Sequence, residues 1–214
     1  MKVIDDIRDL DKPVYAVVTI GTFDGVHVGH QAILKRLVEE AKENNGKSIL
    51  ITFWPHPRFI LNNDSDTLKL ITTFDEKAHL ISQLGVDYLL KIAFTPSFAT
   101  LSADEFVQTV LVDGVGTKQL FIGYDHHFGN NREGNIQFLQ KKADLYGFKV
   151  NEIPKQEIDS VGVSSTKIRS AVNSGEIHLA NVLLGRNYSL EGTVIHGNKQ
   201  GRSIGFPTAN IEVV

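Results

Sequence analysis

The feature that most constrains this chain is an apolar strand followed at once by a glycine-rich turn and a helix. Residues 14–20 form a near-continuous apolar run, typical of a strand buried on both faces of a parallel sheet. Gly21, Gly25 and Gly29 follow, and apolar side chains then recur at helical spacing over residues 31–44. This order predicts a turn at the carboxyl end of a strand, where open α/β sheets bind ligands.

The same alternation continues to residue 184. Further strands are predicted at residues 48–53, 88–92, 119–122 and 148–153. Helices are predicted after the capping-box pairs Thr73–Glu76 and Ser102–Glu105, around residues 136–146, and near 166–173 and 176–184. Strands that alternate with helices predict the α/β class, with a Rossmann-like, doubly wound parallel sheet and right-handed crossovers.

The pattern changes after Gly185. Residues 188–195 resemble a β-strand, and Gly197, Gly201 and Gly205 punctuate the segment that follows. One or two strands cannot bury a core of their own. We therefore expect two regions, a first domain over residues 1–185 and the first strands of an incomplete all-β domain over residues 186–214.

Composition excludes several classes of protein. Apolar residues make up 42% of the chain and charged residues 22%, which excludes an intrinsically disordered protein. The formal charge of −3 lacks the basic excess typical of duplex nucleic-acid binding, and the absence of cysteine excludes disulfides and thiolate chemistry. The N-terminal residues lack a secretory pattern and no long apolar run occurs, so we expect a cytoplasmic protein with neither nucleic acid nor membrane as partner.

The strongest chemical signal is residues 21–30, Gly-Thr-Phe-Asp-Gly-Val-His-Val-Gly-His. Its glycines allow a tight turn and close approach of the backbone to a ligand, and the helix start directs free N–H groups at that ligand. His27 and His30 are three residues apart, so both imidazoles can face one point. Such an anion site with two titratable donors suits phosphoryl or nucleotidyl transfer.

Residues 21–30 also allow other interpretations. The pattern is neither the dinucleotide-binding fingerprint nor a P-loop, and it could be a plain turn with two surface histidines. A zinc site is less favoured, because the spacing of the histidines matches no metal-binding motif. The histidines that follow strands are His27, His30, His56, His126 and His127.

Three further segments carry polar or aromatic groups after predicted strands. Residues 164–169 place hydroxyls and an arginine at a helix start, which favours a second anion clamp, although Ser165 could act only as a helix cap. Residues 123–135 mix acids, bases, aromatics and glycines and suit an adenine or ribose contact, or form only a polar loop. Residues 53–59 form a proline-stiffened aromatic shelf, with core packing as the alternative.

In this order, residues 21–30, 53–58, 123–129 and 164–169 resemble the prokaryotic bifunctional riboflavin kinase/FAD synthetases, whose second activity is FMN adenylyltransfer. Residues 201–210, Gly-Arg-Ser-Ile-Gly-Phe-Pro-Thr-Ala-Asn, look like the riboflavin kinase signature. The resemblance covers essentially the whole chain. It implies a nucleotidyltransferase-type fold followed by the start of a β-barrel kinase domain.

The resemblance also implies a reaction and a set of residues. ATP and FMN would give FAD and pyrophosphate, with the FMN phosphate attacking the α-phosphorus in line, Mg²⁺ assisting and no covalent enzyme intermediate. Catalytic roles would fall to His27, His30 and Arg169. ATP contacts would be Gly21, Phe23, Asp24, Gly29, Asp125, Ser164, Ser165 and Thr166. The flavin pocket would include Phe53, Pro55, Pro57, Arg58 and Phe128.

The second domain leads to a further expectation. The family would use Thr208 and Asn210 as magnesium–ATP contacts in a complete kinase domain, and places no metal-ligating side chain in the first domain. A complete protein would also phosphorylate riboflavin to FMN, whereas we expect residues 1–214 not to do so. Two alternatives stay open: a nucleotidyltransferase for another phosphorylated acceptor, such as a pantetheine or nicotinamide nucleotide, and a non-catalytic flavin or nucleotide binder.

Overall fold

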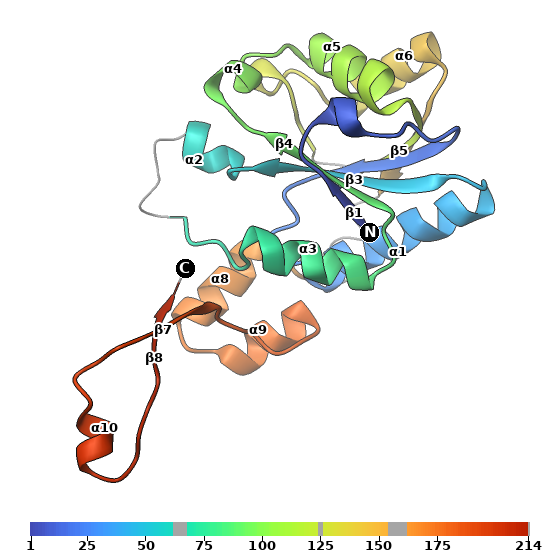
Figure 1. The fold of residues 1–214 in the computed structure, drawn as a ribbon. Helices are drawn as coiled ribbons and strands as arrows, with labels where there is room; N and C mark the ends of the chain where they lie inside the picture. The colour runs from blue at the N-terminus through green and yellow to red at the C-terminus, as the bar shows by residue number, and fades with distance from the viewer. Residues whose placement is uncertain (62–67, 124–125, 154–161, 214) are drawn as a thin grey trace.

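A parallel sheet forms the centre of the computed structural model, which describes residues 1–61, 68–123, 126–153 and 162–213. Six strands lie in the order β1-β4-β3-β2-β5-β6 (Figure 1). They are β1 (Lys2–Ile4), β2 (Ala16–Ile20), β3 (Lys47–Trp54), β4 (Tyr88–Ala93), β5 (Thr117–Gly123) and β6 (Lys149–Ile153). Each neighbouring pair is parallel, which confirms the predicted α/β class.

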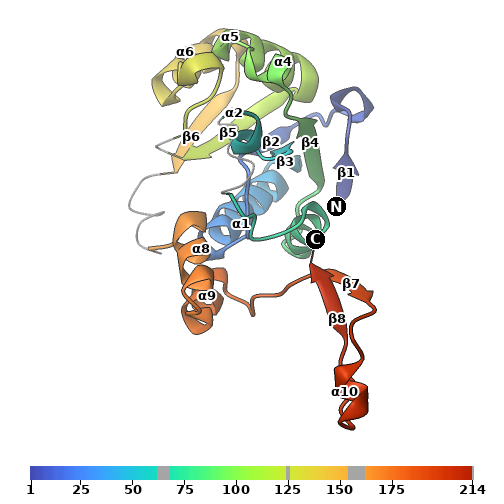
Figure 2. The ribbon, with the colours of Figure 1, turned by 90° about the vertical axis from the view of Figure 1, so that its left-hand side faces the viewer.

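Helices cover both faces of this sheet (Figures 1 and 2). One face carries α1 (Val28–Glu43) and α3 (Phe74–Gln83), and the other carries α5 (Ala103–Phe106), the π-helical η2 (Val107–Val115) and α6 (Ile136–Tyr146). Two further helices, α8 (Ser165–Asn173) and α9 (Ile177–Leu184), pack on each other. The short helices are η1 (Ile7–Asp9), α2 (Pro57–Leu61), α4 (Pro96–Ala99) and η3 (Asn130–Arg132).

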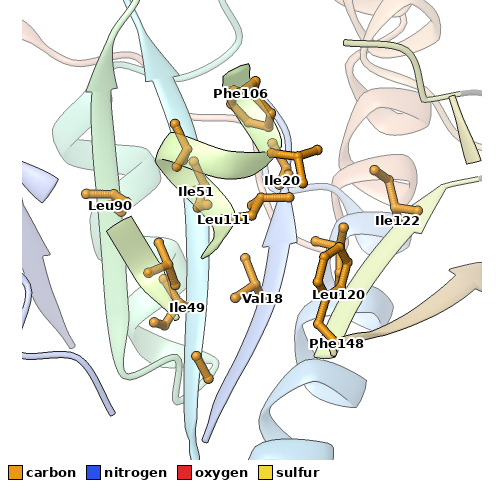
Figure 3. Close-up of a cluster of buried hydrophobic side chains, with 14 of the residues drawn as sticks. Val18, Ile20, Ile49, Ile51, Leu90, Phe106, Leu111, Leu120, Ile122 and Phe148 are labelled. Atoms are coloured by element: carbon orange, nitrogen blue, oxygen red, sulfur yellow. The ribbon is translucent and has the colours of Figure 1, made fainter. Parts of the chain in front are cut away.

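The core follows from the apolar strands identified in the sequence. All five residues of β2 are buried, as expected for a strand covered on both faces. Val18 and Ile20 pack with Phe106 and Leu111 on one side of the sheet (Figure 3). Val17 joins the opposite cluster, which includes Leu34, Leu37 and Ile81 from the helices there. Alternate side chains of one strand therefore hold helices on both faces.

Local sequence signals fix where several helices begin. Both predicted capping boxes are confirmed. The Thr73 hydroxyl accepts the backbone N–H of Glu76 at 3.2 Å, and the Glu76 carboxylate accepts the N–H of Thr73 at 2.9 Å. Helix α8 is capped by Ser164, whose hydroxyl accepts the N–H of Lys167, rather than by Ser165. Edge strand β1 was not predicted, because three residues are too few to show a period.

The last described residues form a hairpin that extends away from the sheet (Figure 2). Strands β7 (Gly192–Ile195) and β8 (Asn210–Val213) are antiparallel, and α10 (Gln200–Ser203) lies between them in the chain. Every residue of both strands is exposed, which fits the prediction that this segment begins a second, all-β unit. In the described parts of the chain, no helix combines the length and apolar character needed to cross a bilayer.

The strand order reverses its direction across the sheet at β2, in the middle of the sheet. This position is called the topological switch point. From β2 the chain moves to β3 and β4 on one side, whereas β5 and β6 continue on the other side. The segments that follow β2 and β5 therefore diverge at the carboxyl edge of the sheet. A crevice between such segments is where doubly wound sheets bind ligands.

Candidate active site

A cavity of about 850 Å³ opens at this switch point. Its walls come from the turn after β2, the first turn of α1, helix α2, the loop after β5 and the start of α8. Its volume lies within the range of small-molecule and cofactor sites. The four segments singled out in the sequence therefore meet at one place, although they are far apart in the chain.

His27 and His30 face each other at the start of α1. Their rings are stacked, with centroids 3.5 Å apart and planes inclined by 14°. Nδ1 of His27 accepts the backbone N–H of His30 at 3.3 Å, so His27 caps the helix with its own ring. Nδ1 of His30 is buried and has no hydrogen-bond partner within the described residues. An unpaired buried nitrogen beside a cavity is a group that a ligand could satisfy.

Both imidazoles are neutral near pH 7. Burial lowers the pKa of His27 from 6.5 to about 4. The pKa of His30 lies well below 6.5, mainly through burial and further through electrostatic interactions with His27 and Lys77. A neutral imidazole carries one N–H donor and one acceptor nitrogen. The pair can thus donate hydrogen bonds to an anion without first binding protons.

These pKa values predict an acid-sensitive fold. The unfolded chain binds protons at His27 near pH 6.5 and the folded chain only near pH 4. The histidine contribution to the free energy of unfolding is therefore complete above pH 6.5 and is lost as the pH falls from 6.5 to 4. Urea unfolding at a series of pH values measures this slope. His27→Gln should reduce the slope without abolishing it, because burial also lowers the pKa values of His30 and His56. An unchanged slope in that variant would contradict the assignment.

Gly25 is required by its backbone conformation, and Gly29 leaves little room for a side chain. Gly25 has φ +82°, in the left-handed region, and a Cβ atom there would lie 3.0 Å from the side chain of Ile71. At Gly29 a Cβ atom would lie 3.2 Å from Val163 and 3.3 Å from the His27 ring. The turn is therefore packed tightly against its neighbours both before and after His27.

Asp24 and Arg169 lie together, but not in the lining of the cavity. The Asp24 carboxylate accepts the backbone N–H groups of Ile71 at 3.0 Å and Thr72 at 3.2 Å, and it pairs with the Arg169 guanidinium. The Asp24 side chain is 5% exposed and that of Arg169 is 16% exposed. This buried ion pair ties residues 71–72 and helix α8 to the turn after β2.

The same turn is held by the start of α8. The Ser165 hydroxyl donates to the backbone carbonyl of Asp24 at 2.9 Å, and Nε of Arg169 donates to the carbonyl of Lys69 at 2.7 Å. Helix α8 therefore does two things at once. It presents Ser164 and Ser165 to the cavity, and it fixes the segment that carries the histidines.

The structure gathers most of the predicted site residues around the cavity. Those that line it are Gly21, Phe23, His27, Gly29, His30, Phe53, Pro57, Arg58, Phe128, Ser164 and Ser165. Those outside the lining are Asp24, Pro55, Thr166 and Arg169. Asp125 lies outside the described residues.

An aromatic wall on one side of the cavity extends beyond the residues predicted from sequence. Phe98 lies 5.8 Å from Phe53 and 6.2 Å from Phe106 between ring centroids, and Phe106 lies 5.4 Å from Phe128. All four rings line the cavity. Phe98 and Phe106 were missed because they lie on α4 and α5, between β4 and β5, where the Ser102–Glu105 capping box marks a helix start but no ligand site. The sequence signal was only a recurrence of phenylalanines.

Lys77 was also missed. Its side chain on α3 is buried, and Nζ donates to the Thr22 carbonyl at 3.1 Å and to the Thr52 hydroxyl at 3.3 Å. Nζ also lies 5.4 Å from the Trp54 ring centroid. Burial lowers the pKa of Lys77 to about 8, which leaves it largely protonated at pH 7. A buried positive charge therefore lies behind the turn after β2.

Replacing Lys77 by methionine is expected to raise the pKa of His30, because one of the charges that disfavour its protonation is removed. The pKa should stay below 6.5, since burial is the larger cause. A histidine NMR titration measures the change, with exposed Lys35→Met as the matched control. An unchanged His30 pKa in Lys77→Met would contradict this electrostatic link.

Metal binding by side chains alone is not a feature of the described residues. Within them, no group of three or more His, Asp or Glu side chains is arranged to hold a metal ion. Mg²⁺ commonly keeps several waters and binds through substrate phosphates, so a magnesium–nucleotide complex would not need ligands from these side chains.

The fold and the site together define a nucleotide-binding α/β protein of the nucleotidyltransferase type, with a switch-point cavity and a histidine pair at a helix start. Two protein-family models match the chain. The FAD synthetase family model matches residues 10–167, and the riboflavin kinase family model matches residues 184–214. The chain belongs to the FAD synthetase family.

Curated relatives agree with this assignment. A protein of Buchnera aphidicola is 42% identical over 100% of this chain and 69% of its own length. A Listeria monocytogenes protein is 41% identical over 98% of this chain and 65% of its own length, and an Escherichia coli K12 protein is 38% identical over 99% and 68%. All three are described as bifunctional riboflavin kinase/FMN adenylyltransferases. The chain thus spans about two-thirds of the length of these relatives.

Solved structures support the fold. A Streptococcus pneumoniae structure described as a macrolide-efflux protein has a TM-score of 0.81 and 28% identity, covering 100% of this chain and 69% of that one. A Thermus thermophilus pantothenate synthetase structure has a TM-score of 0.50 at 16% identity, covering 86% of this chain and 81% of that one. The second likeness concerns the fold alone.

Proposed function

We propose that this chain transfers AMP from ATP to FMN, forming FAD and releasing pyrophosphate. One observation carries the proposal: a neutral, stacked histidine pair with an unpaired buried nitrogen lies at the switch-point cavity, which an aromatic wall also lines. The histidines and the helix start suit a triphosphate, and the wall suits a flat ring. Family membership and the description of the relatives agree with a site for both ATP and FMN.

In this reaction an FMN phosphate oxygen attacks the α-phosphorus of ATP. The new bond joins that oxygen to the α-phosphorus, and the bond between the α-phosphorus and the bridging oxygen to the β-phosphate breaks. The electron pair of the broken bond leaves with pyrophosphate. No enzyme group becomes covalently attached, so the work of the protein is to position the substrates and stabilise charge.

His27 and His30 would stabilise the charge that develops on the transferred phosphoryl group. Each neutral imidazole can donate one N–H, and the backbone N–H groups and dipole of α1 add to the same field. Mg²⁺, when bound with the nucleotide, would offset charge on the leaving pyrophosphate. Because the histidines are held by stacking and by the cap of His27, they need little rearrangement during the reaction.

The remaining predicted residues divide between the two substrates. Gly21, Phe23 and Gly29 would contact ATP along the turn, Asp125 would contact the adenosine, and Ser164, Ser165 and Thr166 would hold the pyrophosphate. For Asp24 and Arg169 the observed contacts support a positioning role, because their charged groups pair with each other. The flavin pocket would comprise Phe53, Pro55, Pro57, Arg58 and Phe128, with Phe98 and Phe106 completing the wall.

We also propose that the two regions of the chain belong to different activities. Residues 1–185 would carry adenylyl transfer, and residues 186–214 would be the start of a riboflavin kinase domain. In a complete protein, Thr208 and Asn210 would contact magnesium–ATP during phosphorylation of riboflavin. This proposal rests on the sequence signature at residues 201–210 and on the family match at residues 184–214.

Pyrophosphate release with ATP and Mg²⁺ tests the function, in parallel reactions that contain FMN, riboflavin or no acceptor. We expect release only with FMN, with FAD as the product identified by chromatography. Release with a different phosphorylated acceptor but not with FMN would favour another nucleotidyltransferase. No turnover, with ATP and FMN still bound, would favour a non-catalytic binder.

A further inference from the structure

The segment that leaves the first domain contacts the turn that carries the histidines. Nη1 of Arg186 donates to the backbone carbonyl of Gly25 at 2.9 Å, and the Arg186 side chain is partly buried there. The side-chain amide of Gln31 donates to the carbonyls of Val26 and Leu184, each at 2.9 Å. The carbonyl of Gly25 is thus bonded to Arg186, two residues past the end of α9, and that of Val26 is linked through Gln31 to Leu184, the last residue of α9.

The backbone itself comes equally close. Gly185 ends α9 in the left-handed conformation, with φ +68°. A Cβ atom at this position would lie 2.7 Å from Cγ1 of Val28, the first residue of α1. A side chain at position 185 would therefore push the chain away from the start of the histidine-bearing helix.

Contacts continue along the chain toward the hairpin. Tyr188 packs against the buried cluster of Ile71, Val163 and Ile168, and its N–H donates to the Asn181 side chain at 2.7 Å. Further on, the Thr73 hydroxyl lies 3.2 Å from the Glu191 carboxylate, and the Ser189 hydroxyl lies 3.5 Å from the Glu76 carboxylate. Residues 185–191, which we call the linker strap, therefore run over the first domain from the site to the start of α3.

We propose that the linker strap is part of the adenylyl-transfer site, and that Arg186 is a positioning residue that fixes the Gly25 carbonyl and with it the turn bearing His27. The proposal rests on the proposed function. Residue 186 falls within the match to the riboflavin kinase family, yet its side chain binds the domain matched to FAD synthetase. A group that the sequence assigns to the second unit thus supports the chemistry of the first.

The positive charge of Arg186 also acts on the His27 ring. The Arg186 guanidinium disfavours protonation of His27, adding to the larger effect of burial on the pKa of that ring. Because the strap leads directly into β7, displacement of the hairpin would also act on Gly25 through Arg186. The second unit would then influence adenylyl transfer without contacting ATP.

The test uses the full chain of residues 1–214 with Arg186→Met, Arg186→Lys and the exposed, remote Arg8→Met as matched control. Steady-state kinetics give kcat and the KM values for ATP and FMN, and hydrogen–deuterium exchange follows the peptide covering residues 21–31. Arg186→Met should lower kcat by about tenfold or more while the KM for FMN stays near its original value, because the aromatic wall is untouched. Exchange in residues 21–31 should increase.

Arg186→Lys should recover part of both effects, since an ammonium can still donate to the Gly25 carbonyl, and Arg8→Met should show neither. A kcat within twofold of the original in Arg186→Met would overturn the proposal, even if the melting temperature fell. Unchanged exchange in residues 21–31 would overturn it as well. If the unaltered chain forms no FAD, the proposed function fails, and exchange alone then decides whether Arg186 holds the turn.

Discussion

Replacing Asp24 by alanine or asparagine is expected to lower the free energy of unfolding by about 3–5 kcal/mol, the usual cost of removing one partner of a buried ion pair. The Arg169 guanidinium would be left largely buried without its counter-charge. With alanine, the N–H groups of Ile71 and Thr72 would also lose their acceptor. The loss of stability is large because the Asp24 carboxylate joins three segments: the turn after β2, residues 71–72 and helix α8.

Urea unfolding at pH 7 measures this effect, with exposed Asp144→Asn as the matched control, for which a change within about 0.5 kcal/mol is expected. The double variant Asp24→Asn with Arg169→Met should be less destabilised than the sum of the single variants, by about 0.5–3 kcal/mol, because the two side chains interact directly. Additive effects, or a loss below about 1 kcal/mol in Asp24→Asn, would argue against a structural ion pair at this site.

His30→Ala is expected to lower kcat/KM for FAD formation by about 10²–10³-fold, the usual effect of removing one preorganised donor to a developing charge. The His30 ring lies within the cavity lining, stacked on His27, and its Nδ1 has no partner among the described residues. The ring is therefore available to a substrate. Its removal would also leave His27 without its stacking neighbour.

The matched control is His79→Ala, which changes an exposed histidine on α3 and should leave kcat/KM within about twofold. His30→Asn distinguishes two roles for the ring. An amide can donate a hydrogen bond but cannot act as a general base, so partial recovery relative to alanine supports the donor role. Equal activity of His30→Ala and the unaltered chain would remove His30 from the mechanism.

The sequence alone was sufficient to predict the class of fold and the position of the cavity. Apolar strands such as residues 16–20 are long enough to be recognised, and the capping boxes at Thr73 and Ser102 mark their helix starts through contacts three residues apart. The His27–His30 pair was visible for the same reason, because its spacing and its helix are local. The principle that strand ends carry ligands then located the site.

The other groups around the cavity could be identified only from the three-dimensional packing of the chain. Nothing in the local sequence links Lys77, Phe98, Phe106 or Arg186 to the turn after β2. The fold brings Lys77 and Arg186 against that turn and the two phenylalanines into the lining of the cavity. The tertiary structure also paired Asp24 with Arg169 across 145 positions of chain, whereas the sequence suggested that both groups face the substrate. Such long-range contacts depend on how helices pack and on which charged groups become buried. No repeating pattern along the sequence predicts either of these.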